Sequence, residues 1–222
     1  GDRDGSALNS AEAALKRHFG HGALRPFQRE AISAWAAGRD ALVTLATGAG
    51  KSLCFQLPPM CAAPGRWALV ISPLVALMQD QVRTLRQRQI PAGLCGSGAE
   101  GDMAATLEAM AAGRLRIVYA CPEFVLQRLP EFARLRGSIC LLGVDEAHCI
   151  SSWGQDFRPA YRELGRLREA LAGVPVMCVT ATCTPRVAAD IARCLALRPG
   201  SARVGGPMNR PNLLYAVRER TT

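Results

Sequence analysis

A short glycine-rich segment has the composition of a phosphate-binding loop. It follows an apolar run at 41–45 and consists of Thr47, Gly48, Ala49, Gly50, Lys51 and Ser52. Glycines let backbone N–H groups approach phosphate oxygens, and a helix that starts there adds the positive end of its dipole. Lys51 would then reach the β and γ phosphates of a nucleotide, and the Ser52 hydroxyl would ligate Mg²⁺. The alternative is a glycine-rich turn that binds nothing, but lysine and serine follow in the order that a phosphate site needs.

Two adjacent carboxylates follow a second apolar run, at 139–144. The segment reads Asp145, Glu146, Ala147 and His148. A buried strand that ends in two carboxylates places negative charge at the ligand crevice of an open α/β sheet. Asp145 would hold Mg²⁺, and Glu146 would polarise the attacking water. A solvated acidic turn is the alternative, and the preceding phosphate loop argues against it.

A third polar group, Thr180 and Thr182, ends the apolar run at 176–180. Taken alone, two threonines around an alanine indicate a turn or a helix cap. After the two motifs above, they fall where hydroxyl groups could link a nucleotide site to the movement of a neighbouring part.

The elements that must position these motifs alternate between short apolar runs and stretches with helical periodicity. This alternation predicts βαβ units and a parallel sheet. We expect strands at 41–45, 67–71, 92–95, 116–120, 139–144, 176–180 and 202–204. We expect helices at 26–37, 51–61, 74–88, 102–112, 123–135, 160–171 and 185–195. The fold class is therefore α/β, a mainly parallel sheet with helices on both faces.

Composition limits the class of protein and its partners. Hydrophobic residues make up 49% and charged residues 20% of the chain, which argues against a disordered or fibrous protein. The 27 basic and 18 acidic residues give a net charge of +9, and the only lysines are Lys16 and Lys51, so arginine-rich binding to a polyanion is expected. The nine cysteines form no zinc pattern, and we expect them to be reduced and mostly buried. No apolar run is long enough for a membrane span.

The 222 residues favour one large domain. Residues 1–10 lack the apolar stretch of a signal peptide and are expected to be an N-terminal tail. The domain would occupy 11–206. Residues 207–222 follow Gly205 and Gly206, contain Pro207 and Pro211 and then a strand-like run at 213–217, and are expected to lead out of the domain.

Three further motifs make a resemblance specific. They are LRPFQ at 24–28, SPLVALMQDQV at 72–82, and WGQDFRP at 153–159, which continues the DEAHCIS segment that begins at Asp145. With the two motifs for phosphate and metal, they closely resemble the RecQ family of superfamily 2 DNA helicases from about residue 13 to residue 212. The resemblance implies that this chain is the first of two RecA-like P-loop NTPase lobes.

The same resemblance assigns roles to individual residues. It implies that Gln28, helped by Arg25, reads the adenine edge of ATP, and that His148 belongs to the nucleotide site. It also implies that the aromatic-rich loop senses single-stranded DNA and relays this to the ATP site; the loop residues are Trp153, Phe157 and Arg158. The alternatives are a surface pair at a helix start for the first two residues and a buried anchor for the aromatic ones.

The activity implied is ATP-driven, 3′ to 5′ unwinding of DNA in repair and recombination, with ATP and Mg²⁺ at the site. The partners would be single-stranded DNA, duplex junctions and a second RecA-like lobe, with no membrane. The composition favours a bacterial cytoplasm, associated with the nucleoid, over a nucleus. Two alternatives remain at this point: a nucleotide-gated DNA-binding or interaction module without motor activity, and a lobe of a DEAD/DEAH-box RNA helicase.

Overall fold

The fold is built on one parallel sheet. It is described from a computed structural model that covers residues 2–96, 103–154, 156–206 and 216. The strands are β1 (Ala41–Thr44), β2 (Trp67–Ile71), β3 (Ala92–Cys95), β4 (Ile117–Ala120), β5 (Ile139–Val144), β6 (Val176–Thr180) and β7 (Ala202–Gly205). They lie in the order β3-β4-β2-β5-β6-β1-β7, and every pair is parallel. The predicted α/β fold and all seven predicted strands are confirmed.

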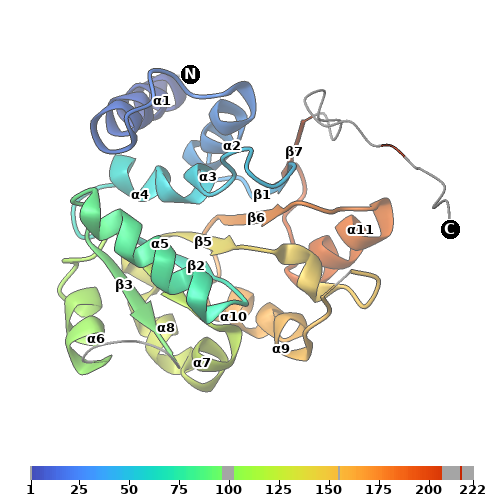
Figure 1. Cartoon of the computed structure of the whole chain (residues 1–222). Helices are drawn as coiled ribbons and strands as arrows, with labels where there is room; N and C mark the ends of the chain where they lie inside the picture. Colours follow the sequence, from blue (N-terminus) through green and yellow to red (C-terminus); the bar gives the residue numbers. More distant parts are fainter. Residues whose placement is uncertain (1, 97–102, 155, 207–215, 217–222) are drawn as a thin grey trace, which may run out of the picture.

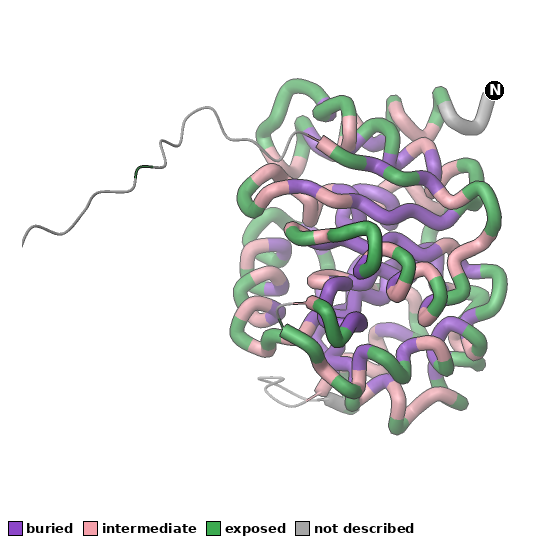
Figure 2. Tube along the Cα trace, turned by 90° about the vertical axis from the view of Figure 1, so that its right-hand side faces the viewer, coloured by how far each residue is buried: buried purple, intermediate pink, exposed green. Residues whose placement is uncertain are grey.

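The strands are apolar on both faces because helices cover both (Figure 1). Alternate side chains of one strand enter different cores: Ala41 and Val43 pack on one side, and Leu42 packs on the other. The strands are consequently buried along most of their length, whereas the helices alternate between buried and exposed residues (Figure 2).

Two groups of helices form the outer layers. One face is covered by α2 (Pro26–Ala36), α3 (Leu53–Gln56), α4 (Pro58–Cys61) and α5 (Val75–Gln87). The other is covered by α6 (Met103–Ala111), α7 (Pro122–Gln127), α8 (Leu129–Leu135), α9 (Pro159–Arg162), α10 (Leu164–Ala170) and α11 (Pro185–Cys194). Two short 3₁₀ turns, η2 (Arg136–Ser138) and η3 (Ala147–Ile150), flank β5. None of the described helices is both long and apolar enough to cross a bilayer.

Three helices predicted as continuous are each divided in two. The helix expected at 51–61 is interrupted at Leu57, and the one expected at 123–135 is interrupted at Arg128. Prolines explain both breaks: Pro58 and Pro59 follow the first, and Pro130 follows the second, and proline lacks the N–H that the helix ladder requires. The helix expected at 160–171 is divided at Glu163.

The amino-terminal segment is helical. Residues 2–10, expected as a tail, are the first turns of α1 (Asp2–Ala14), which continues as the π-helix η1 (Leu15–Phe19). Ala11 and Leu15 are buried against Ile32 of α2, so α1 is part of the packed structure. The apolar side chains of α1 are mostly alanines, so the sequence of this helix shows no clear helical periodicity of hydrophobic residues. The strand-like run at 213–217 lies outside the described residues except for Ala216.

A buried carboxylate ties the amino-terminal edge of the sheet together. Asp40, directly before β1, is fully buried and accepts hydrogen bonds from Arg168 (3.2 Å), from Arg198 (2.7 Å) and from the N–H of Val176 (2.9 Å). Burial acts to raise the pKa of Asp40, but the hydrogen bonds and the charge of Arg168 outweigh it, and the pKa is lowered. The cluster joins β1, β6 and the segment before β7.

Replacing this carboxylate tests the importance of the cluster. We expect Asp40→Ala to lower the free energy of unfolding by about 3 to 5 kcal/mol, because it leaves the buried Arg168 without its partner. The control is Asp80→Ala, which removes an exposed ion pair with Arg83 that is worth about 1 kcal/mol or less. Urea unfolding measures both. Equal losses in the two variants would contradict a structural role for Asp40.

Candidate nucleotide site

The glycine-rich loop is held at the carboxyl end of β1. Leu45, which joins β1 to the loop, remains bonded to β6, since its N–H donates to the carbonyl of Thr180 (3.1 Å). Gly48 and Gly50 have φ values of 79° and 91°, in the left-handed region that side chains with a Cβ avoid. The Lys51 ammonium donates to the carbonyls of Leu45 (2.9 Å) and Ala46 (3.1 Å), which leaves its third N–H for a ligand.

Arg25 and Gln28 come to this loop from the start of α2. The Arg25 guanidinium donates to the carbonyl of Ala49 (2.7 Å), and the Gln28 amide N–H donates to the carbonyl of Gly50 (3.1 Å). Gln28 also accepts from the N–H of Arg25 (2.9 Å). Both residues line a pocket of about 230 Å³ with Leu15, His21, Gly22, Ala23, Gly50 and Leu53. The Gln28 amide keeps a second N–H and a second acceptor lone pair, with which it could contact a base.

The carboxylates follow β5, two strands away from β1 in the sheet order. The N–H of Asp145 still bonds to β2, and Glu146 then turns the chain with φ 46°, an uncommon conformation for a residue with a side chain. Burial, together with the negative charge of Glu146, raises the pKa of Asp145 to about 6. Asp145 is therefore a carboxylate that a cation would stabilise.

Glu146, His148 and the threonines form one network. His148 Nδ1 lies 3.2 Å from Glu146 Oε2 and 2.9 Å from Thr180 Oγ1. The Thr180 hydroxyl donates to the carbonyl of Thr182 (3.0 Å), so it accepts from His148, and Nδ1 carries a proton. The Cys149 and Glu146 side chains raise the pKa of His148 to about 10, and hydrogen bonding to His148 lowers the pKa of Glu146. This pair is ionised at neutral pH.

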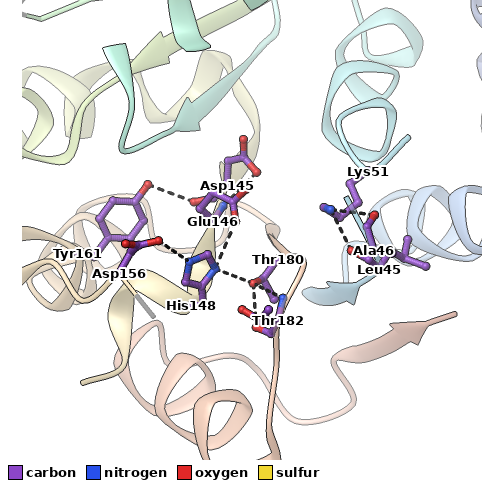
Figure 3. A network of polar contacts seen from close by, with 10 residues as sticks. All are labelled: Leu45, Ala46, Lys51, Asp145, Glu146, His148, Asp156, Tyr161, Thr180 and Thr182. Atoms are coloured by element: carbon purple, nitrogen blue, oxygen red, sulfur yellow. Dashed lines mark hydrogen bonds and ion pairs between the residues drawn. The ribbon is translucent and has the colours of Figure 1, made fainter. Parts of the chain in front are cut away.

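The loop and the carboxylate network meet at one crevice. Figure 3 shows Lys51 on one side and Asp145, Glu146 and His148 on the other, with Thr180 and Thr182 between them. The crevice has a volume of about 470 Å³ and is lined by Thr47, Pro73, Leu74, Glu146, His148, Cys149, Asp156, Arg158, Ala181 and Thr182. Burial lowers the pKa of Lys51, while Glu146 and Asp145 act to raise it. The structure thus brings together the three motifs that the sequence singled out.

These residues fit a nucleotide with Mg²⁺. The ammonium of Lys51 has an unused donor, the left-handed glycines leave room at the backbone, and Asp145 carries a raised pKa that a cation would lower. Ser52 lies in the loop directly before α3, as a hydroxyl ligand of the metal requires.

The aromatic-rich loop lies beside this crevice. Trp153 is 61% exposed and Phe157 is 39% exposed, so neither is a buried anchor of the core. The Arg158 guanidinium donates to the carbonyl of Pro73 (2.8 Å), which ties the loop to the end of β2.

Two contacts of the aromatic-rich loop were not anticipated from sequence. The Ser151 hydroxyl donates to Asp190 (2.6 Å), and Arg186 lies over the Trp153 ring. Both partners belong to α11, more than 30 residues along the chain, and no spacing in the sequence indicates them.

The fold and the site define a P-loop nucleoside triphosphatase domain of the RecA-like type. The family model "DEAD/DEAH box helicase" matches residues 25–191. The chain belongs to the DEAD/DEAH box helicase family.

Relatives refine this assignment. The chain is 43% identical over 220 residues to "ATP-dependent DNA helicase Q-like SIM" of Arabidopsis thaliana, covering 94% of this chain and 25% of that protein. It is 39% identical over 214 residues to "ATP-dependent DNA helicase RecQ" of Haemophilus influenzae, covering 95% of this chain and 34% of that protein. The resemblance to RecQ helicases is confirmed, and the chain spans about a quarter to a third of the length of these two relatives.

A solved structure supports the fold independently. The DUF1998 helicase MrfA, in a crystal structure bound to DNA and AMPPNP, matches with a TM-score of 0.68 at 22% identity. The match covers 88% of this chain and 28% of that one. This likeness shows the fold alone.

The raised pKa of Asp145 predicts that its ionised carboxylate lowers the free energy of unfolding of the metal-free chain. In the folded state this pKa is about 6, above its ordinary value of 3.8, so ionisation destabilises the fold as pH rises through this interval. We expect Asp145→Asn, which keeps the acceptor for the Glu146 N–H, to stabilise the metal-free chain by about 2 to 3 kcal/mol at pH 8. The gain should shrink as pH falls from 6 to 4. Thermal unfolding at several pH values measures it, and no gain at pH 8 would contradict the burial argument.

Proposed function

We propose that this chain is the ATP-binding lobe of a RecQ-like, ATP-dependent DNA helicase that moves 3′ to 5′. The observation that carries the proposal is that Lys51 faces Asp145 and Glu146 at the carboxyl edge of the sheet, beside a crevice that Thr47 and Glu146 line. The names of the relatives support DNA as the nucleic acid. In this proposal the lobe includes helix α1 and extends to residue 206, and the following residues lead to a second RecA-like lobe.

Each polar group has a task in ATP hydrolysis. Lys51 balances the charge of the β and γ phosphates, and Gln28 with Arg25 contacts the adenine. Asp145 and Ser52 would hold Mg²⁺, which neutralises phosphate charge when bound. Glu146 orients and deprotonates the attacking water, and its pairing with His148 keeps it ionised and able to accept the proton.

DNA would contact the aromatic-rich loop. Trp153 and Phe157 are exposed, as base stacking requires, and the chain is strongly basic. Arg158, bonded to the carbonyl of Pro73, would position the loop beside the crevice. Thr180, bonded to His148 and to the carbonyl of Thr182, would connect this region to Glu146. The DNA would be single strands and duplex junctions met in repair and recombination, in a bacterial nucleoid or a nucleus.

Two variants test the assignment of the nucleotide site in the full-length protein. Lys51→Ala should reduce ATP hydrolysis by about 10² to 10³, because one electrostatic contact in a water-poor site is lost. Glu146→Gln should retain nucleotide affinity and trap bound ATP, since the amide keeps the shape but accepts no proton. Filter binding and steady-state hydrolysis measure these effects. The assignment fails if Lys51→Ala hydrolyses ATP near the normal rate, or if Glu146→Gln loses affinity instead of turnover.

A third variant tests the coupling to DNA. Trp153→Ala in the full-length protein should lower DNA-stimulated ATP hydrolysis while basal hydrolysis and melting temperature stay nearly constant, because the ring is exposed. A base stacked on one aromatic ring contributes about 1 to 3 kcal/mol. The measurement is the ratio of stimulated to basal rate. An unchanged ratio would indicate a DNA-binding module or nucleotide-gated domain in which this loop does not couple.

A further inference from the structure

The exposed ring of Trp153 is covered on one face by a cation. The Arg186 guanidinium carbon lies 3.5 Å from the centre of the indole ring, well within the range of a cation–π interaction. Both residues are exposed, and Arg186 has no carboxylate partner among the side chains that the structure describes. In Figure 1 the loop after β5 and helix α11 lie next to each other.

Helix α11 fixes both members of this contact. Thr184 caps the helix by accepting from the N–H of Val187 (3.3 Å), and Val187 is buried in the core. From the same helix, Asp190 accepts from the Ser151 hydroxyl (2.6 Å), which in turn accepts from the backbone N–H of Trp153 (3.2 Å). The backbone at Arg186 is therefore held by the helix cap, and the backbone at Trp153 is held by its bond to Ser151.

Helix α11 follows the two threonines of the nucleotide site, Thr180 and Thr182, in the chain. Arg186 belongs to α11, and Thr180, a few residues before α11, is bonded to His148. A change in the contact between Arg186 and Trp153 would therefore act on a helix that is connected to the nucleotide site.

We infer that Arg186 is a DNA-contacting residue that covers Trp153 until single-stranded DNA arrives. This inference rests on the proposed function. A base that stacks on Trp153 competes with the guanidinium for the covered face, and stacking is the stronger of the two contacts at an exposed site. The displaced guanidinium then binds the phosphate of the stacked nucleotide, because arginine pairs with phosphate oxygens in bidentate fashion.

The first experiment needs no DNA. Acrylamide quenching of tryptophan fluorescence reports the exposure of Trp153, and Trp153→Phe supplies the signal of the other two tryptophans, of which Trp67 is fully buried. Arg186→Gln should increase quenching of the Trp153 component. The control is Arg166→Gln, which makes the same change of charge at an exposed arginine of α10 paired only with Glu163; it should leave quenching unchanged. Equal quenching in the parent, Arg186→Gln and Arg166→Gln would show that Arg186 does not cover the Trp153 ring.

The second experiment measures binding of a single-stranded oligonucleotide to the 222-residue chain at several salt concentrations. Arg186→Gln should reduce the slope of log affinity against log salt by about 0.7, the value of one phosphate contact. Arg186→Lys should retain most of this slope, since it keeps the charge, and Arg166→Gln should match the parent. A parental slope in Arg186→Gln overturns the DNA contact.

The two proposals fail in different ways. If the parent chain binds no DNA at any salt concentration, the proposed function fails, and the quenching result still decides whether Arg186 covers the ring. If the parent binds DNA and Trp153→Phe weakens it, but Arg186→Gln does not differ from Arg166→Gln, only the inference about Arg186 is wrong. A lower melting temperature of Arg186→Gln with a parental salt slope would assign it a purely structural role.

Discussion

Four ionisable groups must lie together at one edge of the sheet while partly withdrawn from water, and the rest of the structure follows from that constraint. Charges in such a site need partners. Lys51 donates hydrogen bonds to carbonyls next to its own loop, Glu146 forms an ion pair with His148, and His148 is also hydrogen-bonded to Thr180. The strand order β5-β6-β1 satisfies this requirement because it places the threonine strand between the lysine strand and the carboxylate strand. Burial still dominates the pKa of both Lys51 and Asp145, and Asp145 is the group expected to meet a metal ion.

The two ends of the sheet show how burial serves different purposes. Asp40, at the amino-terminal edge, is fully buried, but two arginines and two backbone N–H groups hold its pKa below the ordinary value. Asp145, at the carboxyl edge, has its pKa raised by burial and by its neighbour Glu146. The first carboxylate is satisfied by the protein itself and stabilises the fold. The second lowers stability, as is common for residues arranged to bind a ligand that the folded chain does not supply.

Much of this could be predicted from the sequence, because the relevant signals are local. Apolar runs bounded by turn residues predicted all seven strands, and the glycine-rich loop and the DEAH segment predicted which residues gather at the carboxyl edge of the sheet. Other features depend on tertiary packing. The Arg186–Trp153 contact and the Ser151–Asp190 bond join residues more than 30 positions apart, and the bond from Gln28 to Gly50 depends on where the loop folds. Helix α1 was missed because its alanine-rich face gives a weak periodic signal, and two predicted helices are broken by prolines within them.

The most direct test of the central claim is a crystal structure of this chain with Mg²⁺ and a non-hydrolysable ATP analogue. The account predicts that Lys51 exchanges at least one of its carbonyl bonds for a phosphate oxygen, that the metal lies between Ser52 and Asp145, and that the adenine contacts Gln28. Phosphates bound elsewhere, with Lys51 still bonded to Leu45 and Ala46, would contradict it.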